Sequence, residues 1–256
     1  MIPWFELHTI PIGPISIQTW GTLVATGLLT AFWAAARRAK KLGQVAPKHV
    51  WDFATWAFLF AFVCARIFHV LFYDPAWYMS HPWDAINPAL PGYSMVGGLL
   101  GGVLAGLIYV RWHKLNMWDM SDLAGYATPL GIGIGRIGCF LIHDHPGTPT
   151  NFFLGVQYPD GGRHDHGLYL SLIGWLMFVA FWSLGRKPRR DGFFAGWFLV
   201  LDGAMRFYLD FYRAVDVKYG GLTPTQWLLM LSVLLGAVIL NKARLPSWAL
   251  RKISTK

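Results

Sequence analysis

Hydrophobic residues in this chain fall into long, nearly uninterrupted runs that are separated by shorter polar segments. A helix needs about 20 apolar residues to cross the hydrocarbon core of a bilayer, and several runs reach that length. Only helices and closed barrels satisfy their backbone polar groups in lipid, and runs this long predict helices. We expect about seven spans, at Ile15–Ala36, Trp51–Tyr73, Ser94–Val110, Ser121–Ile142, Leu168–Leu184, Phe193–Tyr212 and Leu222–Leu240.

The basic residues are gathered at alternate ends of these runs. Sixteen of the 22 Lys and Arg residues lie in segments 37–48, 111–114, 186–190 and 242–256. Retained cations mark the cytoplasmic side of a membrane protein. We therefore place the N-terminus outside and the C-terminus in the cytoplasm, with long outer loops near 74–93 and 143–167. The predicted fold is all-α, a single polytopic transmembrane domain over residues 1–256.

Composition supports the membrane class. Hydrophobic residues make up 55% of the chain and charged residues 14%, against about 25% charged in an average soluble domain. The net charge of +9 lies at the ends of the apolar runs, so we expect membrane lipids as partners and no nucleic acid. Cys64 and Cys139 both lie inside apolar runs and suggest no disulfide framework.

Glycine is dense in two of the runs, at Gly97–Gly106 and Gly131–Gly138. Small residues three or four apart let helices approach closely in lipid, which accounts for the first run. The second contains a literal GxGxxG, but no βαβ unit surrounds it, so it is not a dinucleotide-binding motif.

Three arginines lie within the predicted spans, at Arg66, Arg136 and Arg206. A charge in the bilayer is costly and needs a partner or a task. Asp210 follows Arg206 by four residues and is one candidate partner on the same helix face. Arg136 has no acid within one helical turn, and the glycines beside it leave room for a ligand that a guanidinium can grip, such as a phosphate. If the three converge, they form a cationic pocket for an anionic lipid headgroup.

Histidines are concentrated in the second outer loop, in His143-Asp144-His145 and His164-Asp165-His166. Three interpretations stay open. The first is a metal site, for which these segments supply no thiol. The second is a general base or substrate contact, since a neighbouring carboxylate can orient imidazole. The third is a polar, solvated loop. We assign no metal and no cofactor.

Several motifs together resemble one known family, the bacterial prolipoprotein diacylglyceryl transferases. The resemblance runs over almost the whole chain and is carried by the following segments: Ile12-Gly13-Pro14 with Trp20-Gly21, Ala35–Ala39, Ala65-Arg66-Ile67, Leu71–Asp74, Gly133–Phe140, His164–Leu170, Gly203–Phe207 and Asp210–Arg213.

The resemblance implies transfer of a diacylglyceryl group from phosphatidylglycerol to the thiol of the lipobox cysteine in a prolipoprotein signal peptide. It implies that Arg136 and Arg206 hold the departing phosphate. We add His143, His145 and His164 as candidate catalytic residues. The candidate substrate-binding residues are Arg66, Tyr73, Gly135, Gly138, Cys139, Tyr169 and Asp210.

The sequence also departs from the family pattern. Val96 stands where the family typically has a histidine, Cys139 stands where it has an asparagine, and Leu170 replaces a glutamate. Two explanations follow: the His-Asp-His segments supply the base, or the chain is a divergent paralogue that uses another acceptor or only binds phospholipid. A flippase is disfavoured, because the seven runs show no internal repeat.

Overall fold

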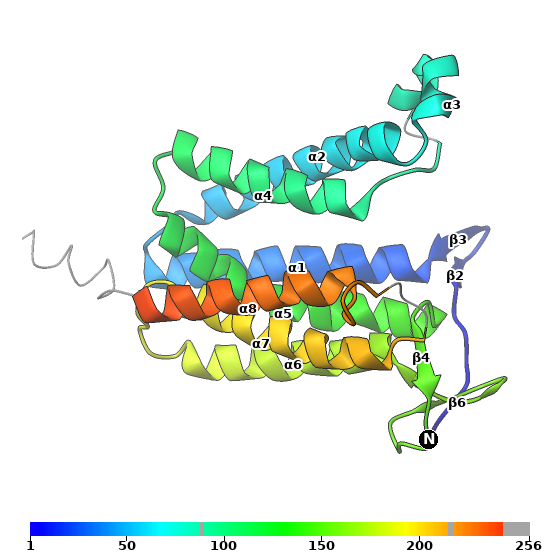
Figure 1. The fold of residues 1–256 in the computed structure, drawn as a ribbon. Coiled ribbons are helices and arrows are strands. Elements are labelled where there is room, and N and C mark those ends of the chain that lie inside the picture. The colour runs from blue at the N-terminus through cyan, green and yellow to red at the C-terminus, as the bar shows by residue number, and fades with distance from the viewer. Residues whose placement is uncertain (88–89, 215–217, 243–256) are drawn as a thin grey trace, which may run out of the picture. The chain divides into compact units, whose positions relative to one another are not determined.

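The computed structural model describes residues 1–87, 90–214 and 218–242. These divide into two compact units. Unit 1 combines residues 1–38 with the chain from Ser121 onward, and unit 2 is Ala39–Met120. Figure 1 shows helices as the main component of both.

The helices are α1 Thr19–Leu42, α2 Pro47–Phe72, α3 Pro75–Ser80, α4 Met95–Trp112, α5 Met117–Ile142, α6 His166–Leu184, α7 Phe193–Leu209 and α8 Pro224–Lys242, with 3₁₀ turns η1 Pro82–Ile86 and η2 Asp210–Tyr212.

Each of the seven predicted spans corresponds to a helix, although several ends move. Five helices are long and apolar enough to cross a membrane, namely α1, α2, α5, α6 and α8. The apolar part of α4, Val96–Trp112, and the 17-residue α7 are shorter. The prediction of a helical, polytopic membrane protein is confirmed, while the number of spans and the orientation of the termini stay predictions.

In unit 1, α1, α5, α6, α7 and α8 run side by side (Figure 1). Glycines allow these helices to pack closely against one another. A Cβ on Gly27 of α1 would lie 2.6 Å from the Gly131 carbonyl of α5, and a Cβ on Gly174 of α6 would lie 2.6 Å from the Gly133 nitrogen. Such contacts leave no room for a side chain, so the second glycine run also serves helix packing.

Two small β-sheets, which the sequence reading missed, belong to unit 1. One is four-stranded in the order β1 Ile2–Pro3, β5 Val156–Tyr158, β6 Gly161–Asp165 and β4 Pro146–Pro149. β1 runs parallel to β5, and the other neighbours are antiparallel. The second is a hairpin of β2 Thr9–Ile12 and β3 Ile15–Gln18. The predicted outer loop 143–167 therefore carries ordered strands between α5 and α6.

The hairpin also corrects the start of the first predicted span. We expected helix from Ile15, but α1 begins at Thr19, since Ile15–Gln18 pairs with Thr9–Ile12. The turn between them has Gly13 at φ +62°, a conformation that glycine adopts without strain.

In unit 2, α2 and α4 pack against each other (Figure 1). A Cβ on Gly97 would lie 2.5 Å from the Cys64 carbonyl, and one on Gly101 would lie 2.6 Å from the Phe60 carbonyl. This confirms that the first glycine run allows close helix contact.

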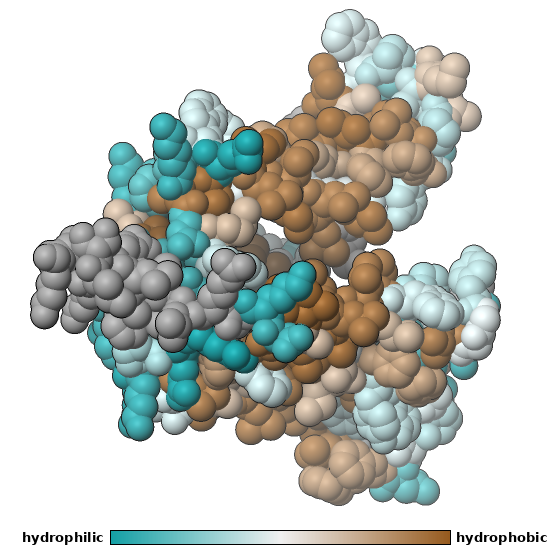
Figure 2. All heavy atoms as spheres, turned by 60° about the vertical axis from the view of Figure 1, so that its left-hand side comes forward, coloured by the Kyte–Doolittle hydropathy of each residue, from teal (hydrophilic) through white to brown (hydrophobic). Residues whose placement is uncertain are grey.

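Large apolar side chains are exposed along the helices, as lipid-facing surfaces require. Leu29 and Leu234 in unit 1 are 60% and 61% exposed, and Phe58 in unit 2 is 65% exposed. Figure 2 shows broad hydrophobic areas over the helices, with hydrophilic groups concentrated away from them. These exposed faces add to the evidence that the helices lie in lipid.

Candidate functional site

Arg136 lies in the last third of α5 and is half-buried. Its Nη1 is 3.7 Å from Cys139 Sγ, one helical turn further on. Among the residues that the structure describes, Arg136 forms no ion pair with a carboxylate. A cation in an apolar helix that lacks an acidic partner is the feature expected of a residue that binds an anionic ligand.

Gly135 and Gly138 face α1. A Cβ on Gly138 would lie 3.2 Å from Trp20 Cα and 3.3 Å from Leu23 Cβ, and one on Gly135 would lie 3.8 Å from Val24 Cα. These glycines have their role in helix packing. The structure thus favours a packing role over the substrate contact that we predicted for them.

Arg206 has a different partner from the one we considered. Its Nε donates to both carboxylate oxygens of Asp202, at 2.9 and 2.8 Å, four residues before it on α7. Asp210 instead accepts a short hydrogen bond from the Thr223 hydroxyl, and it forms an ion pair with Arg213, whose Nη1 lies 3.3 Å from Oδ1. The predicted ion pair between Arg206 and Asp210 is therefore wrong. α7 ends at Leu209, and Asp210 begins the 3₁₀ turn η2, with its carboxylate directed toward Thr223.

Arg66, in unit 2, is buried and surrounded by backbone carbonyls. Its guanidinium donates to the carbonyl oxygens of Asp84, Ala85, Asn87, Leu90, Pro91 and Gly92, at 2.5–3.3 Å. A guanidinium has five N–H donors, so these carbonyls occupy its capacity. The contacts favour a structural role for Arg66 in holding the predicted outer loop 74–93, in place of the phosphate contact that we predicted.

Tyr73 caps the end of α2 and is 62% exposed, with its ring stacked on His69. It lies in unit 2, as Arg66 does, and the convergence of that unit's residues with Arg136 and Arg206 stays a prediction.

His143 is fully enclosed. Its Nδ1 is 2.7 Å from Asp165 Oδ2, its Nε2 is 2.8 Å from the Phe5 carbonyl, and its ring stacks on Trp4. Tyr158 donates to the same Asp165 oxygen at 2.8 Å, and burial beside Asp165 raises the pKa of that phenol. Both ring nitrogens of His143 are engaged with buried acceptors, so the geometry favours a structural role over the base that we predicted.

His145 is half-buried in the loop after α5, beside Asp144 and Cys139. Its Nδ1 forms a short hydrogen bond with Asp144. Hydrogen bonds with Asp144 and, second, with Cys139 raise the pKa of His145 to about 9. The imidazole is therefore protonated at neutral pH, which argues against its acting as a free base there.

His164 has the opposite character. It lies on β6 and its Nδ1 is 2.8 Å from the Tyr169 hydroxyl of α6. Burial, and then the neighbouring His166, lower the pKa of His164 below its usual range. Its Nε2 forms no hydrogen bond with any of the described residues. Of the three predicted histidines, His164 has the properties that a general base at neutral pH needs.

A cavity of about 210 Å³ opens beside His145. It is lined by Asp144, His145, Pro146, His166, Arg213 and Ala214. Within the described part of the chain, the buried Nδ1 of His166 has no hydrogen-bond partner, while its Nε2 is 2.9 Å from the Leu209 carbonyl. His166 thus has one ring nitrogen that is enclosed and unpaired, while the cavity itself is lined by charged and polar side chains.

The site thus contains two groups of the residues singled out from sequence. Arg136, Cys139 and His145 lie together, and His164 lies against Tyr169. Sequence reasoning gave too little weight to Asp202, although its spacing of four residues before Arg206 was a readable signal. It missed the contact of Cys139 with His145, because the turn after α5 that joins them has no clear sequence signature.

The sequence comparisons agree with this architecture. The family model described as prolipoprotein diacylglyceryl transferase matches residues 8–241. The chain belongs to the prolipoprotein diacylglyceryl transferase family.

Relatives are similar over almost their whole length. A phosphatidylglycerol–prolipoprotein diacylglyceryl transferase of Chromohalobacter salexigens is 33% identical, covering 98% of this chain and 94% of the relative. One of Nitratidesulfovibrio vulgaris (strain DP4) is 35% identical, covering 93% and 95%. One of Bordetella avium is 30% identical, covering 93% and 94%.

Membership of this family, with the apolar helices, makes the chain a multi-pass transferase of the bacterial cytoplasmic membrane that acts in lipoprotein biosynthesis.

Proposed function

We propose that this protein transfers a diacylglyceryl group from phosphatidylglycerol to the thiol of a lipobox cysteine in a prolipoprotein signal peptide. The observation that carries the proposal is Arg136, a half-buried cation on an apolar helix without an acidic partner among the described residues. The relatives are named for the two substrates, phosphatidylglycerol and prolipoprotein.

The reaction breaks the bond between the terminal glycerol carbon of the diacylglyceryl group and its phosphate oxygen. The acceptor sulfur forms a new bond to that carbon, and the thiol proton is released. Glycerol phosphate leaves with one more negative charge than the phosphodiester had. Arg136 stabilises this developing charge, which is where a fixed cation lowers the barrier most effectively.

Arg206 is a weaker contributor to the same task. Its ion pair with Asp202 neutralises part of its charge. The contacts with Asp202 use Nε, so among the described residues the two Nη groups remain for a headgroup oxygen. Its side chain is 24% exposed, which leaves it accessible. We assign Arg206 to holding the donor and Arg136 to stabilising the leaving group.

His164 accepts the proton that the acceptor thiol releases. Its lowered pKa keeps the ring neutral near pH 7, and Tyr169 holds Nδ1 so that Nε2 can accept a proton. The rate should then fall as the pH drops below about 6.5, where an ordinary imidazole becomes charged, with the midpoint displaced to lower pH by the burial of His164.

The membrane orientation is part of the proposal. With the N-terminus outside, the end of α5 and the β-sheet face the side of the membrane where an exported signal peptide arrives. The charge distribution supports this orientation. Residues 1–256 then form one transmembrane domain whose outer segments carry the histidines.

The test is turnover by the purified protein. Phosphatidylglycerol labelled in the headgroup is supplied with a lipobox peptide, and both free glycerol phosphate and the mass of the peptide are followed. We expect the peptide to gain one diacylglyceryl group for each glycerol phosphate released. The same peptide with serine in place of cysteine should gain nothing. Phospholipid binding without release, for any thiol peptide, would favour the non-catalytic paralogue.

A further inference from the structure

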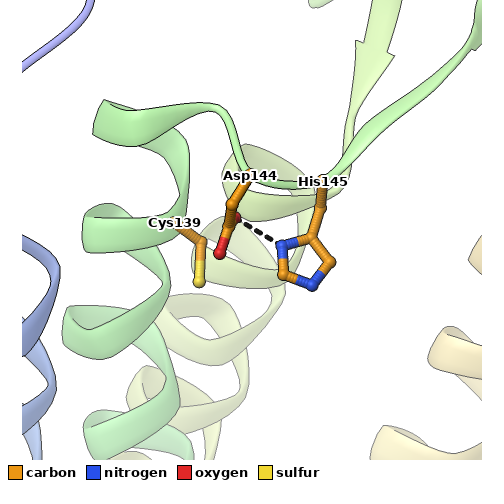
Figure 3. Close-up of side chains that lie close together, drawn as sticks. All are labelled: Cys139, Asp144 and His145. Atoms are coloured by element: carbon orange, nitrogen blue, oxygen red, sulfur yellow. Dashed lines mark hydrogen bonds and ion pairs between the residues drawn. The ribbon is translucent and has the colours of Figure 1, made fainter. Parts of the chain in front are cut away.

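Three metal-ligating side chains meet at the outer end of α5, namely Cys139, Asp144 and His145. Figure 3 shows the thiol of Cys139 coming from the helix, and the carboxylate of Asp144 lying between that sulfur and the imidazole of His145. One ligand atom from each lies within 4.8 Å of the other two. We expected no thiol near the His-Asp-His segments, and the chain places one there.

The local backbone explains this meeting. α5 ends at Ile142, and His143 then adopts φ +49°, the left-handed region that a non-glycine residue rarely takes. The left-handed residue turns the chain back, so Asp144 and His145 return to the last helical turn, where Cys139 lies. The buried contacts of His143 with Asp165 and Phe5 hold that turn in place.

We propose that Cys139, Asp144 and His145 bind a thiophilic divalent cation, for which Zn²⁺ is the natural choice, and that its remaining coordination position takes the acceptor thiol. The thiol part of this proposal rests on the proposed function, and the metal part does not.

The donor set fits zinc. Sulfur, nitrogen and carboxylate oxygen are its usual ligands, at about 2.0–2.3 Å, and three protein ligands with one open position are typical of a catalytic zinc. Ligands at those lengths lie roughly 3.5 Å from one another in a tetrahedral site. The three side chains need only small rotations to reach that spacing, and the metal would replace the proton shared between Asp144 and His145.

The charges also fit. A thiolate and a carboxylate together neutralise a divalent cation. Arg136 Nη1 lies 3.7 Å from Cys139 Sγ and places a fixed positive charge beside the site. The cavity beside Asp144 and His145 gives a second ligand room to approach.

Zinc in this position would supply what the chain lacks at Val96. A thiol bound to Zn²⁺ loses its proton outright, so no strong base is needed to ionise it. The thiol proton would pass to His164, for which the lowered pKa of the bound thiol makes a weak base sufficient; the bound sulfur would then attack the glycerol carbon, and the carbon–oxygen bond to phosphate would break. Arg136 holds the departing phosphate one helical turn from the metal, so the two reacting groups are brought together.

Cobalt provides a direct probe of the metal site, since Co²⁺ accepts the same ligands as Zn²⁺ and shows a thiolate charge-transfer band in the near ultraviolet when sulfur is a ligand. Co²⁺ is titrated into purified protein that has been stripped of metal. We expect a thiolate band that saturates at one ion per chain. Cys139→Ser should abolish the band, while Cys64→Ser, the matched control in α2, should keep it.

Histidine variants test the second ligand. His145→Ala should weaken Co²⁺ binding at least about tenfold, and His8→Ala, which removes an exposed imidazole outside the ligand set, should leave it unchanged. Absence of a thiolate band, or an undiminished band in Cys139→Ser, would overturn the metal site.

The remaining coordination position of the metal is tested with the lipobox peptide. A lipobox peptide added to the Co²⁺ protein should strengthen the thiolate band as a second sulfur binds, and the serine peptide should not. An unchanged spectrum with the thiol peptide would overturn the thiol-binding role.

Turnover separates this inference from the proposed function. Transfer that survives complete metal removal would overturn the metal's role and leave the transferase reaction standing. Cobalt bound through Cys139 with no transfer to any thiol peptide would support the metal site and overturn the proposed function.

Discussion

Asp165 is the centre of a buried network, and its removal tests whether His143 is structural. Oδ2 accepts from His143 at 2.7 Å and from Tyr158 at 2.8 Å, and Oδ1 accepts from the Leu168 N–H at 2.9 Å, which caps α6. The side chains of Asp165 and His143 are 1% and 0% exposed. Asp165→Ala therefore leaves three donors without their partner in a place that water does not reach.

The expected cost can be built from those contacts. Hydrogen bonds to a charged group contribute about 1.5–3 kcal/mol each, and loss of a helix cap costs about 1 kcal/mol. The losses share one carboxylate and are not additive. We expect the free energy of unfolding to fall by about 3–5 kcal/mol, the range typical of breaking a buried pair by removing one partner.

The assay is denaturant unfolding in detergent, followed by tryptophan fluorescence, in which Trp4 is a local reporter because its ring centroid lies 4.3 Å from that of His143. The matched control is Asp160→Ala, an aspartate of the same loop whose side chain is 57% exposed and pairs with Arg163 at the surface. Its effect should be much smaller.

Equal midpoints for the two variants would refute the reasoning. An Asp165→Ala protein that stays as stable as the control but loses turnover would return His143 to the catalytic role that the sequence suggested.

Three further predictions concern the other assignments. His164→Asn should lower turnover about 10²–10⁴-fold and remove the fall in rate below about pH 6.5, as loss of a general base does; an unchanged pH–rate profile would exclude His164 as the base. Gly27→Ala should lower the free energy of unfolding by about 1–3 kcal/mol, because its Cβ meets the Gly131 carbonyl at 2.6 Å, while Gly21→Ala on the same helix, which meets nothing within 4 Å, should be neutral. Arg66→Lys should make the 84–92 loop more sensitive to protease without changing the KM for phosphatidylglycerol, and a raised KM with an intact loop would return Arg66 to the donor site.

The helices were predictable because bilayer thickness imposes a length and composition that can be read locally. The seven apolar runs became α1, α2 and α4–α8 with end errors of a few residues. The β-sheet was not predictable, since its pairing joins Ile2 to Val156 across most of unit 1. No local pattern carries such a contact.

The candidate site was likewise predictable from the sequence only in part. Arg136 could be found because an intramembrane cation without a nearby acid is visible in the sequence. The roles of the histidines could not. His143 depends on Phe5, which is far away in sequence, while His145 and His164 depend on how a turn and a strand bring them back to Cys139 and Tyr169. Arg66 looked like the other two arginines in sequence, and only its six carbonyl contacts separate it from them.

The central claim is that Arg136 stabilises the departing phosphate, and its most direct test is the single-turnover rate of glycerol phosphate release by Arg136→Ala. Loss of one preorganised donor to a developing oxyanion typically costs about 10²–10³-fold in rate, which is about 2.7–4 kcal/mol. We expect a loss of at least that size, with partial recovery in Arg136→Lys, which keeps the charge but not the two-pronged contact. Arg163→Ala removes a cation of β6 that pairs with Asp160, and this variant should release glycerol phosphate at the wild-type rate. An Arg136→Ala protein that releases it as fast as Arg163→Ala would contradict the account.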